Sequence, residues 1–296
     1  MRQWALKVIA VHSSLFLLPA VAALVFRESV RAGDPAARRL AMSWPDNLYD
    51  LVFIPHMDDR LDELAELAEP EEWTYRHTKT DHHKPILFNY LRYTYRRLAE
   101  EDKIVVADDG TAIAFNTGLV TPSQEPIFCY CTQNRLSDQE QPWHFHAWRR
   151  KGEYDLTRFS SLPEMAHYFD DPSLLVLDTR RELRVNVEHI ISDNRERFPA
   201  PYGDMPDYQL QTFLKGAIDN AMQRVRRNYK TAIPQYYRGR IQLLLPLCLS
   251  QPDVADLALV IERHDAFYRV STCLTLDMAY NNARQLARPD RDWLQP

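Results

Sequence analysis

Apolar residues recur every three or four positions in three segments of the chain, a spacing that predicts amphipathic helices. The first covers 58–68, where acidic residues at the start suit the helix dipole. The second covers 85–100 and opens with a proline, which is favoured in a first helical turn. The third covers about 207–231, and its expected buried stripe includes Phe213 and Tyr229. We therefore expect three substantial helices, separated by regions of other patterning.

Alternating apolar and polar residues predict strands around a turn in the first half of the chain. The Asp-Gly pair at 109–110 is a strong turn signal, and it predicts a hairpin over 103–116 in which Val106 faces Ile113. A third strand follows at 126–132. Together these segments predict a small antiparallel meander.

The second half of the chain shows a comparable pattern. A hairpin over 257–276 would place Glu262 opposite Arg269 and Leu257 opposite Leu274, which separates polar from apolar pairs. Helices and antiparallel hairpins without regular alternation of strand and helix predict an α+β fold, with hairpins and a meander packed against several helices.

Three further elements are expected around that hairpin. Residues 174–177 and 240–249 have the composition of strands, and Pro246 in the second indicates a bulge or a sheet edge. Asp277 is placed to cap a final helix that runs to about residue 287.

The order helix, helix and hairpin in the N-terminal part is similar to that of a winged helix. Residues 85–100 would be the recognition helix, and the turn at 109–110 would be the tip of the wing. One helix is missing from the comparison, because residues 71–84 show no helical period.

Composition indicates a globular protein and excludes two nucleotide-binding motifs. With 296 residues, of which 45% are hydrophobic, the chain can bury a sizeable core. Its seven glycines are so far apart that neither a P-loop nor a GxGxxG turn is present. The net charge of −5 argues against a surface that is positive throughout, so any nucleic acid would need a local patch.

The first 44 residues form a separate segment, and the single domain expected over 45–296 contains two possible lobes divided near residue 136. Residues 8–26 are an apolar run that could anchor the protein in a membrane or belong to a signal peptide. Translation from Met42 is the third possibility. The intact mass of the natural protein would distinguish these possibilities, because a start at Met42 removes the anchor entirely.

The cysteines favour a reducing compartment, so we expect a cytoplasmic protein, with a membrane-anchored one as the alternative. Four cysteines occur without any zinc-binding spacing. His144 and His146 would share one face of a strand and could form half of a metal site with His82 or His83, but this spacing is common, and we assign no metal. Alternatively, the tryptophans at 143 and 148 would stack bases beside the basic residues that follow them. The commonest explanation for such a segment is a packed strand with a charged end.

Several segments resemble an uncharacterised family of bacterial and fungal domains, over residues 48–294. The segments that carry the resemblance are LYDLVFIP, LFNYLRYTYRRL, AFNTGLVTPSQEPIF, NYKTAIPQYY, LLLPL and LTLDMAYNNAR. The resemblance implies a shared fold and, because such domains occur beside cold-shock-like or other RNA-binding modules, a link to RNA. It implies no catalytic residue and no cofactor.

Amides, hydroxyls and cations are concentrated at the ends of predicted elements, where binding sites tend to be built. One group ends the first hairpin, a second surrounds Pro234, and a third lies on the final helix. The candidate ligand-binding residues are Asn116, Thr117, Gly118, Asn228, Lys230, Gln235, Tyr236, Asn281, Asn282 and Arg284. Each group could instead cap its own turn or helix.

We therefore expect an intracellular protein that binds RNA or a nucleotide in a polar pocket formed by these residues. The first alternative is an enzyme that processes nucleotides or RNA ends, in which Lys230, Asp277 or a histidine acts on a phosphate. The second is a membrane-anchored interaction protein. The pocket requires that side chains far apart in the sequence converge in space.

Overall fold

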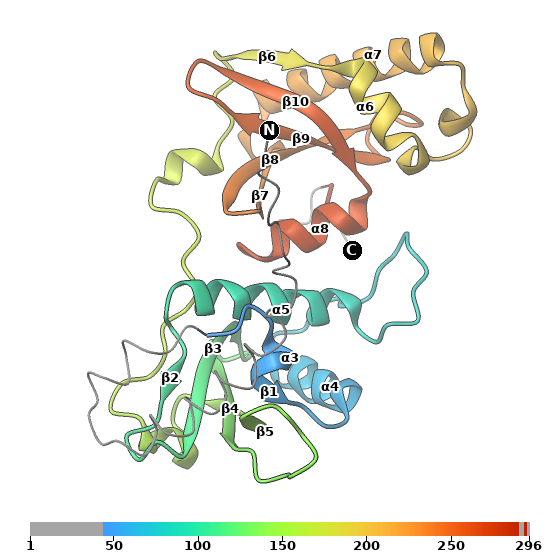
Figure 1. The fold of residues 1–296 in the computed structure, drawn as a ribbon. Coiled ribbons are helices and arrows are strands. Elements are labelled where there is room, and N and C mark those ends of the chain that lie inside the picture. The colour runs from blue at the N-terminus through green and yellow to red at the C-terminus, as the bar shows by residue number, and fades with distance from the viewer. Residues whose placement is uncertain (1–43, 290–292, 295–296) are drawn as a thin grey trace, which may run out of the picture.

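Two five-stranded sheets organise the chain, and helices pack on both (Figure 1). The structure is a computed structural model that describes residues 44–289 and 293–294. Sheet A has the strand order β1-β5-β4-β3-β2, and sheet B has the order β6-β10-β9-β8-β7. The predicted α+β fold is confirmed.

The N-terminal lobe contains sheet A. Its elements are α3 (Leu48–Leu51), β1 (Val52–Phe53), α4 (Met57–Leu67), α5 (Pro85–Glu100), β2 (Val105–Val106), β3 (Ala112–Val120), β4 (Pro126–Gln133), β5 (Trp143–Arg150) and the 3-10 helix η1 (Tyr154–Arg158). The α5 helix has the predicted bounds. The predicted hairpin is β2–β3, in which Val106 pairs with Ile113 as expected.

The C-terminal lobe contains sheet B. Its helices are η2 (Pro172–Leu175), α6 (Val187–Asn194), η3 (Arg195–Arg197), η4 (Tyr202–Asp204), α7 (Asp207–Arg227), η5 (Tyr229–Thr231) and α8 (Leu276–Arg284). Its strands are β6 (Glu182–Val185), β7 (Ile233–Tyr237), β8 (Arg240–Leu247), β9 (Leu257–Arg263) and β10 (Phe267–Leu274). The α7 helix packs on one face of sheet B and α8 on the other.

The two lobes share one hydrophobic core. The largest cluster of buried side chains joins Leu91 of α5 and Phe115 of β3 to Leu244 of β8 and Ala279 of α8. A second cluster lies between α6, α7 and the other face of sheet B. Because burial of apolar area is the main favourable term in folding, the shared core holds the lobes together. In Figure 1, α5 and α8 lie between the two sheets.

The arrangement of the N-terminal lobe differs from a winged helix. The β2–β3 hairpin is one edge of a five-stranded sheet, whose other edge is the parallel pair β1–β5. Residues 71–84 contain no helix. The α5 helix contacts sheet A on one side and α8 on the other, so it is not free to enter a DNA groove.

Two expectations about the middle of the chain are wrong, and one alternative is excluded. Residues 174–177 are not a strand, because η2 occupies the first two of them and the strand of this region is β6. The lobes divide between Arg150 and Glu182 rather than near residue 136, since β5 pairs with β4 in sheet A. Both tryptophans of β5 are buried in the core and cannot stack bases.

Local corrections apply to the C-terminal lobe. The α7 helix ends at Arg227, and Phe213 and Tyr229 are exposed. The pair Glu262–Arg269 forms as predicted, but a bulge shifts the rest of the hairpin so that Leu274 pairs with Ala258 and not with Leu257. Pro246 lies in the part of β8 beyond its last pair with β7, where β8 forms the edge of the sheet as predicted.

The N-terminal apolar run at 8–26 and the alternative start at Met42 lie outside the described residues. Within 44–289 and 293–294, no helix combines the length and the apolar composition that crossing a bilayer requires.

Candidate functional site

Side chains from both lobes meet along the seam between α5, α8 and β7. At its centre, Arg284 of α8 donates to Glu71 through two bonds of 2.7 and 3.0 Å. The side chains of Arg284 and Glu71 are only 9% and 4% exposed. The guanidinium also lies 4.5 Å from the ring centre of Tyr90 and 5.3 Å from that of Trp73. A buried charge is tolerated here because an opposite charge and two aromatic faces surround it.

The end of the β2–β3 hairpin meets the same seam. Gly118 has φ +74°, and a Cβ atom there would lie 2.5 Å from the Tyr90 hydroxyl oxygen, so α5 packs against a position that only glycine allows. Its N–H donates to Asn116 Oδ1 at 2.9 Å. Thr117 Oγ1 donates to the Ile127 carbonyl at 2.7 Å. These side chains therefore hold an irregular end of β3.

The final helix binds the segment that precedes α5. Thr275, not Asp277, caps α8, because its Oγ1 accepts from Met278 N–H. Asp277 is buried and accepts from the N–H groups of Arg76 and His77 at 3.2 and 3.1 Å. Asn281 donates to the Tyr75 hydroxyl at 2.5 Å. The carboxylate proposed as a catalytic group is therefore engaged with backbone.

A row of polar side chains runs from α8 across four strands of sheet B. Asn282 donates to Gln235 at 3.1 Å, and Gln235 donates to Gln242 at 2.8 Å. The row continues from Gln242 to Glu262 at 3.1 Å and ends with Arg269, which donates to Glu262 at 3.4 Å. Gln235 and Gln242 are buried, whereas Arg269 is exposed. The polar row thus connects the seam to the surface of the sheet.

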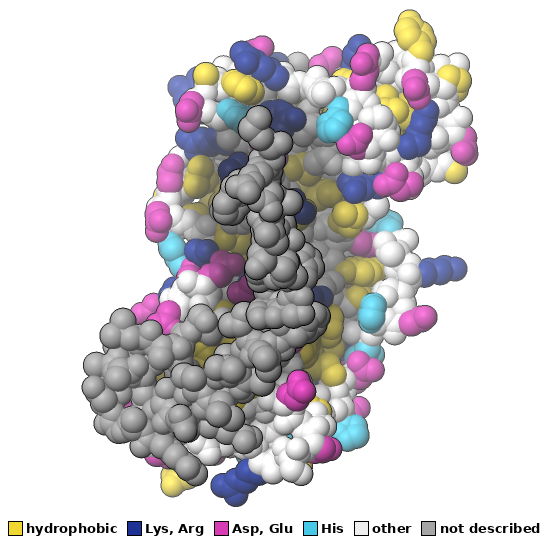
Figure 2. Space-filling view, in the orientation of Figure 1, with side chains coloured by type: hydrophobic (Ala, Val, Ile, Leu, Met, Phe, Trp, Pro, Cys, Tyr) yellow, Lys and Arg dark blue, Asp and Glu magenta, His cyan; other side chains and the backbone are white. Residues whose placement is uncertain are grey.

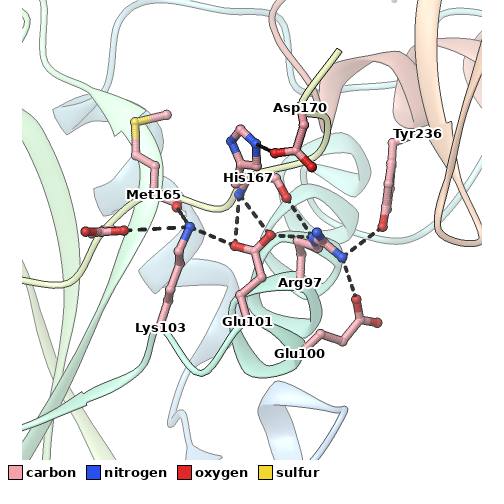
Figure 3. A network of polar contacts seen from close by, with 9 residues as sticks. Arg97, Glu100, Glu101, Lys103, Met165, His167, Asp170 and Tyr236 are labelled. Atoms are coloured by element: carbon pink, nitrogen blue, oxygen red, sulfur yellow. Dashed lines mark hydrogen bonds and ion pairs between the residues drawn. The ribbon is translucent and has the colours of Figure 1, made fainter. Parts of the chain in front are cut away.

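At the other end of α5, a polar network joins β7 to the segment that links the lobes (Figure 3). Arg97 donates to the Tyr236 hydroxyl at 3.2 Å and to the His167 carbonyl at 2.8 Å. Glu101 accepts from the His167 N–H at 2.9 Å and pairs with Lys103 at 3.0 Å. Burial alone would raise the pKa of Glu101, but these partners together hold it below its ordinary value.

Eight of the ten predicted residues therefore lie in or beside the seam, where their polar groups are largely bonded to other protein groups. Gly118 contributes through its backbone. The other two, Asn228 and Lys230, lie on exposed chain at the end of α7, where Asn228 Oδ1 caps η5 by accepting from Lys230 N–H at 3.1 Å. The other eight residues lie near one another in space, and their hydrogen bonds hold the elements of the seam together.

The polar row also defines which side chains share its face of sheet B. Side chains two residues apart on a strand point to the same face. Tyr237 follows Gln235 by two residues, and Phe267 precedes Arg269 by two. Arg240 pairs with Tyr237, and Arg184 of β6 pairs with Arg269. These residues lie beyond α8, toward the ends of the strands.

We call this surface the open face of sheet B. It consists of Arg184, Tyr237, Arg238, Arg240, His264, Phe267 and Arg269. Phe267 is partly exposed and the others are exposed. In Figure 2, basic, histidine and hydrophobic side chains lie together with some acidic ones at the upper left, where Figure 1 places the tip of the β9–β10 hairpin.

Cations and rings are in contact on the open face. The Arg184 guanidinium lies 4.0 Å from the ring centre of Phe267, and the His264 ring stacks on Phe267 at 4.8 Å with an interplanar angle of 9°. Arg238 lies 5.1 Å from the ring centre of Tyr237. Neither Arg238 nor Arg240 forms an ion pair with any described residue. The face therefore offers aromatic rings together with two cations that are not neutralised by an ion pair.

Sequence reasoning missed the open face, although a signal was present. The sequence Tyr-Tyr-Arg-Gly-Arg at 236–240 places aromatic and basic residues around a turn with glycine at φ +80°. The histidines considered for metal binding are separated instead: His144 contacts Phe53, and His83 bonds to Asp62 at 2.7 Å. In the described part of the chain, no three His, Cys, Asp or Glu side chains are grouped to hold a metal ion.

A family model described as "Domain of unknown function (DUF3825)" matches residues 64–293. The chain belongs to the DUF3825 family. The matched region includes the seam, the open face, all of sheet B and the strands of sheet A other than β1. Comparisons with curated proteins and with solved structures find no match.

Proposed function

We propose that this DUF3825 protein binds single-stranded RNA through the open face of sheet B. The observation that carries the proposal is the combination of exposed rings and arginines on one sheet face, in which Tyr237 is 43% exposed beside Arg238 and the exposed His264 ring stacks on Phe267. Sheets that display aromatic rings are a recurrent way to bind single-stranded RNA, because unpaired bases stack on the rings. Such stacking contributes about 1–3 kcal/mol per base.

Charge supports the same surface. Arginines 184, 238, 240 and 269 supply four positive charges, while Glu182, Glu262 and Asp265 supply three negative ones. Glu182 pairs with Arg184 at 2.8 Å, and Glu262 pairs with Arg269 at 3.4 Å. Because the whole chain carries a net charge of −5, a phosphate backbone would be attracted to this local excess and not to the protein in general.

The polar row that starts in the seam positions two side chains of the proposed site. The polar row holds Glu262 and Arg269 at its outer end, beside the stacking positions. A carboxylate oxygen and a guanidinium provide an acceptor and donors for base edges. The predicted residues Gln235 and Asn282 thereby support the site without touching RNA directly.

Fluorescence anisotropy with a labelled oligouridylate tests the proposal. We expect binding that weakens as salt rises, since phosphate contacts release counterions. Replacing Tyr237 or Phe267 by Ala should raise Kd about 5- to 140-fold, which corresponds to the loss of about 1–3 kcal/mol. Tyr229→Ala is the matched control, because Tyr229 is an exposed tyrosine outside the open face.

Two outcomes would overturn the proposal: no binding at low salt, or equal loss of affinity in Tyr229→Ala and Tyr237→Ala. A DNA oligomer of the corresponding sequence shows whether the ribose hydroxyl matters. Electrophoresis of the RNA after incubation separates binding from the alternative of RNA processing, because only an enzyme changes the length of its substrate.

A further inference from the structure

The β6 strand is an edge of sheet B with backbone groups that point away from the sheet. It pairs only with β10 among the strands that the structure describes. The Asn186 N–H donates to the Val270 carbonyl of β10 at 2.9 Å. Since backbone groups alternate in direction along a strand, those of Val185 and Leu183 point the other way. These two residues present an unpaired pattern of donors and acceptors.

A groove runs beside this edge, between β6 and α7. It has a volume of about 590 Å³. Its apolar lining comes from Leu183 and Val185 of β6 and from Ile218 and Met222 of α7. An open strand edge next to apolar side chains is a template for pairing with another strand. The charged residues of β6 indicate which kind of strand would pair with this edge.

The sequence of β6 is complementary to itself in antiparallel pairing. If Leu183 faces Leu183 of a second copy, the outward backbone groups of both copies bond to each other, and Glu182 faces Arg184 on both sides. A register centred on Arg184 would instead place like charges opposite each other, which is unfavourable. Both registers can form backbone hydrogen bonds, but of these two only the register centred on Leu183 also places opposite charges against each other.

The helix that lines the groove has the same complementarity. Asp219 and Arg226 both line it and lie seven residues apart, which places them on one face of α7. Met222 lies between them. If a two-fold axis perpendicular to α7 passed near Met222, the two helices would run antiparallel and Asp219 of each copy would face Arg226 of the other. Self-complementary surfaces of this kind are those that two-fold dimers use.

We propose that the protein forms a two-fold dimer through β6, with Leu183 opposite Leu183, and that sheet B thereby becomes a continuous ten-stranded sheet. The partner that fits this surface is a second copy of the chain. The two-fold axis is perpendicular to the sheet, so both open faces lie on the same side. The dimer does not depend on RNA.

Sedimentation velocity of the full chain without RNA tests the proposal over a range of protein concentrations. The wild-type protein should shift from monomer to dimer as concentration rises. Leu183→Pro removes an N–H that points away from β10, so it should leave the monomer fold intact while raising the dimer dissociation constant at least tenfold. Circular dichroism checks that the fold is retained.

Charge reversal provides a second test that does not rely on proline. Arg184→Glu places carboxylates opposite Glu182 and should raise the dissociation constant at least tenfold. The double variant Glu182→Arg, Arg184→Glu restores opposite charges and should restore the dimer. A wild-type chain that stays monomeric would leave the edge to a strand of another protein and would overturn the proposal. So would a dimer that neither Leu183→Pro nor Arg184→Glu weakens.

Discussion

The seam and the open face are built from similar residues, yet only one presents them to solvent. Tyr236 and Tyr237 are neighbours in β7, and their exposed fractions are 9% and 43%. The Tyr236 hydroxyl accepts a hydrogen bond from Arg97 in the seam, whereas the Tyr237 ring lies on the open face beside the Arg238 guanidinium. Residue type alone therefore does not indicate a binding site. Strand alternation and the element that covers each face decide whether a polar or aromatic side chain stabilises the fold or can meet a ligand.

The largest effect should come from breaking the buried pair in the seam. Glu71→Gln leaves Arg284 buried without an opposite charge and should lower the free energy of unfolding by about 3–5 kcal/mol in urea denaturation. Glu100→Gln is the control, because the Arg97–Glu100 pair is more exposed and should contribute less than about 1 kcal/mol. Equal effects of the two variants would contradict the central role of the seam.

Replacing glycine by alanine tests the same difference between the seam and the open face. Both Gly118 and Gly239 have positive φ, which costs other residues about 1–2 kcal/mol. Only at Gly118 would a Cβ also collide with Tyr90, whereas nothing lies within 4 Å at Gly239. Gly118→Ala should therefore lower the melting temperature more than Gly239→Ala. The reverse order would show that α5 does not pack tightly against β3.

On the open face, affinity and stability should separate. Phe267→Ala and Tyr237→Ala should weaken RNA binding as described above. Tyr237→Ala should change the free energy of unfolding by less than about 0.5 kcal/mol, as surface substitutions usually do. A seam variant that remains folded should have a lower free energy of unfolding but an unchanged affinity for RNA. If Tyr237→Ala unfolds the protein, the open face is part of the core and not a surface for binding.

The smallest effect is the pH dependence of the link between the lobes. The pKa of Glu101 is lowered in the folded protein from a reference value of 4.5. A lowered pKa means that this carboxylate stabilises the fold above the pKa of the unfolded chain, and that the stabilisation is lost as pH falls through the folded-state pKa. Glu101→Gln should be less stable than wild type near pH 7, by about 1 kcal/mol, and the difference should disappear as the pH falls through the folded-state pKa. A difference that stays constant as the pH falls would contradict this account.

Local signals were sufficient to predict several elements of the fold. The α5 helix was predicted with its bounds because its proline and its apolar period act within the same sixteen residues. The β2–β3 register followed from one Asp-Gly turn. The bulge in β10 was not predictable, because it depends on packing against elements distant in sequence.

The candidate site was predictable only in part, for the same reason. The conformation of residues 71–77 depends on α8, which lies about 200 positions later, so nothing local identified Glu71 as the partner of Arg284. Sequence patterning placed Phe267 on a strand, but its exposure depends on where α8 stops covering sheet B. Residue types indicated the chemistry, and the tertiary arrangement determined which of these residues are available.

Hydrogen–deuterium exchange with and without oligouridylate tests most directly whether RNA binds the open face and not the seam. The account predicts slower exchange on RNA addition in the segments 236–241 and 262–269, with no change in α5 or α8. Slower exchange confined to α5 and α8, or no change in either region under conditions where RNA is bound, would contradict it.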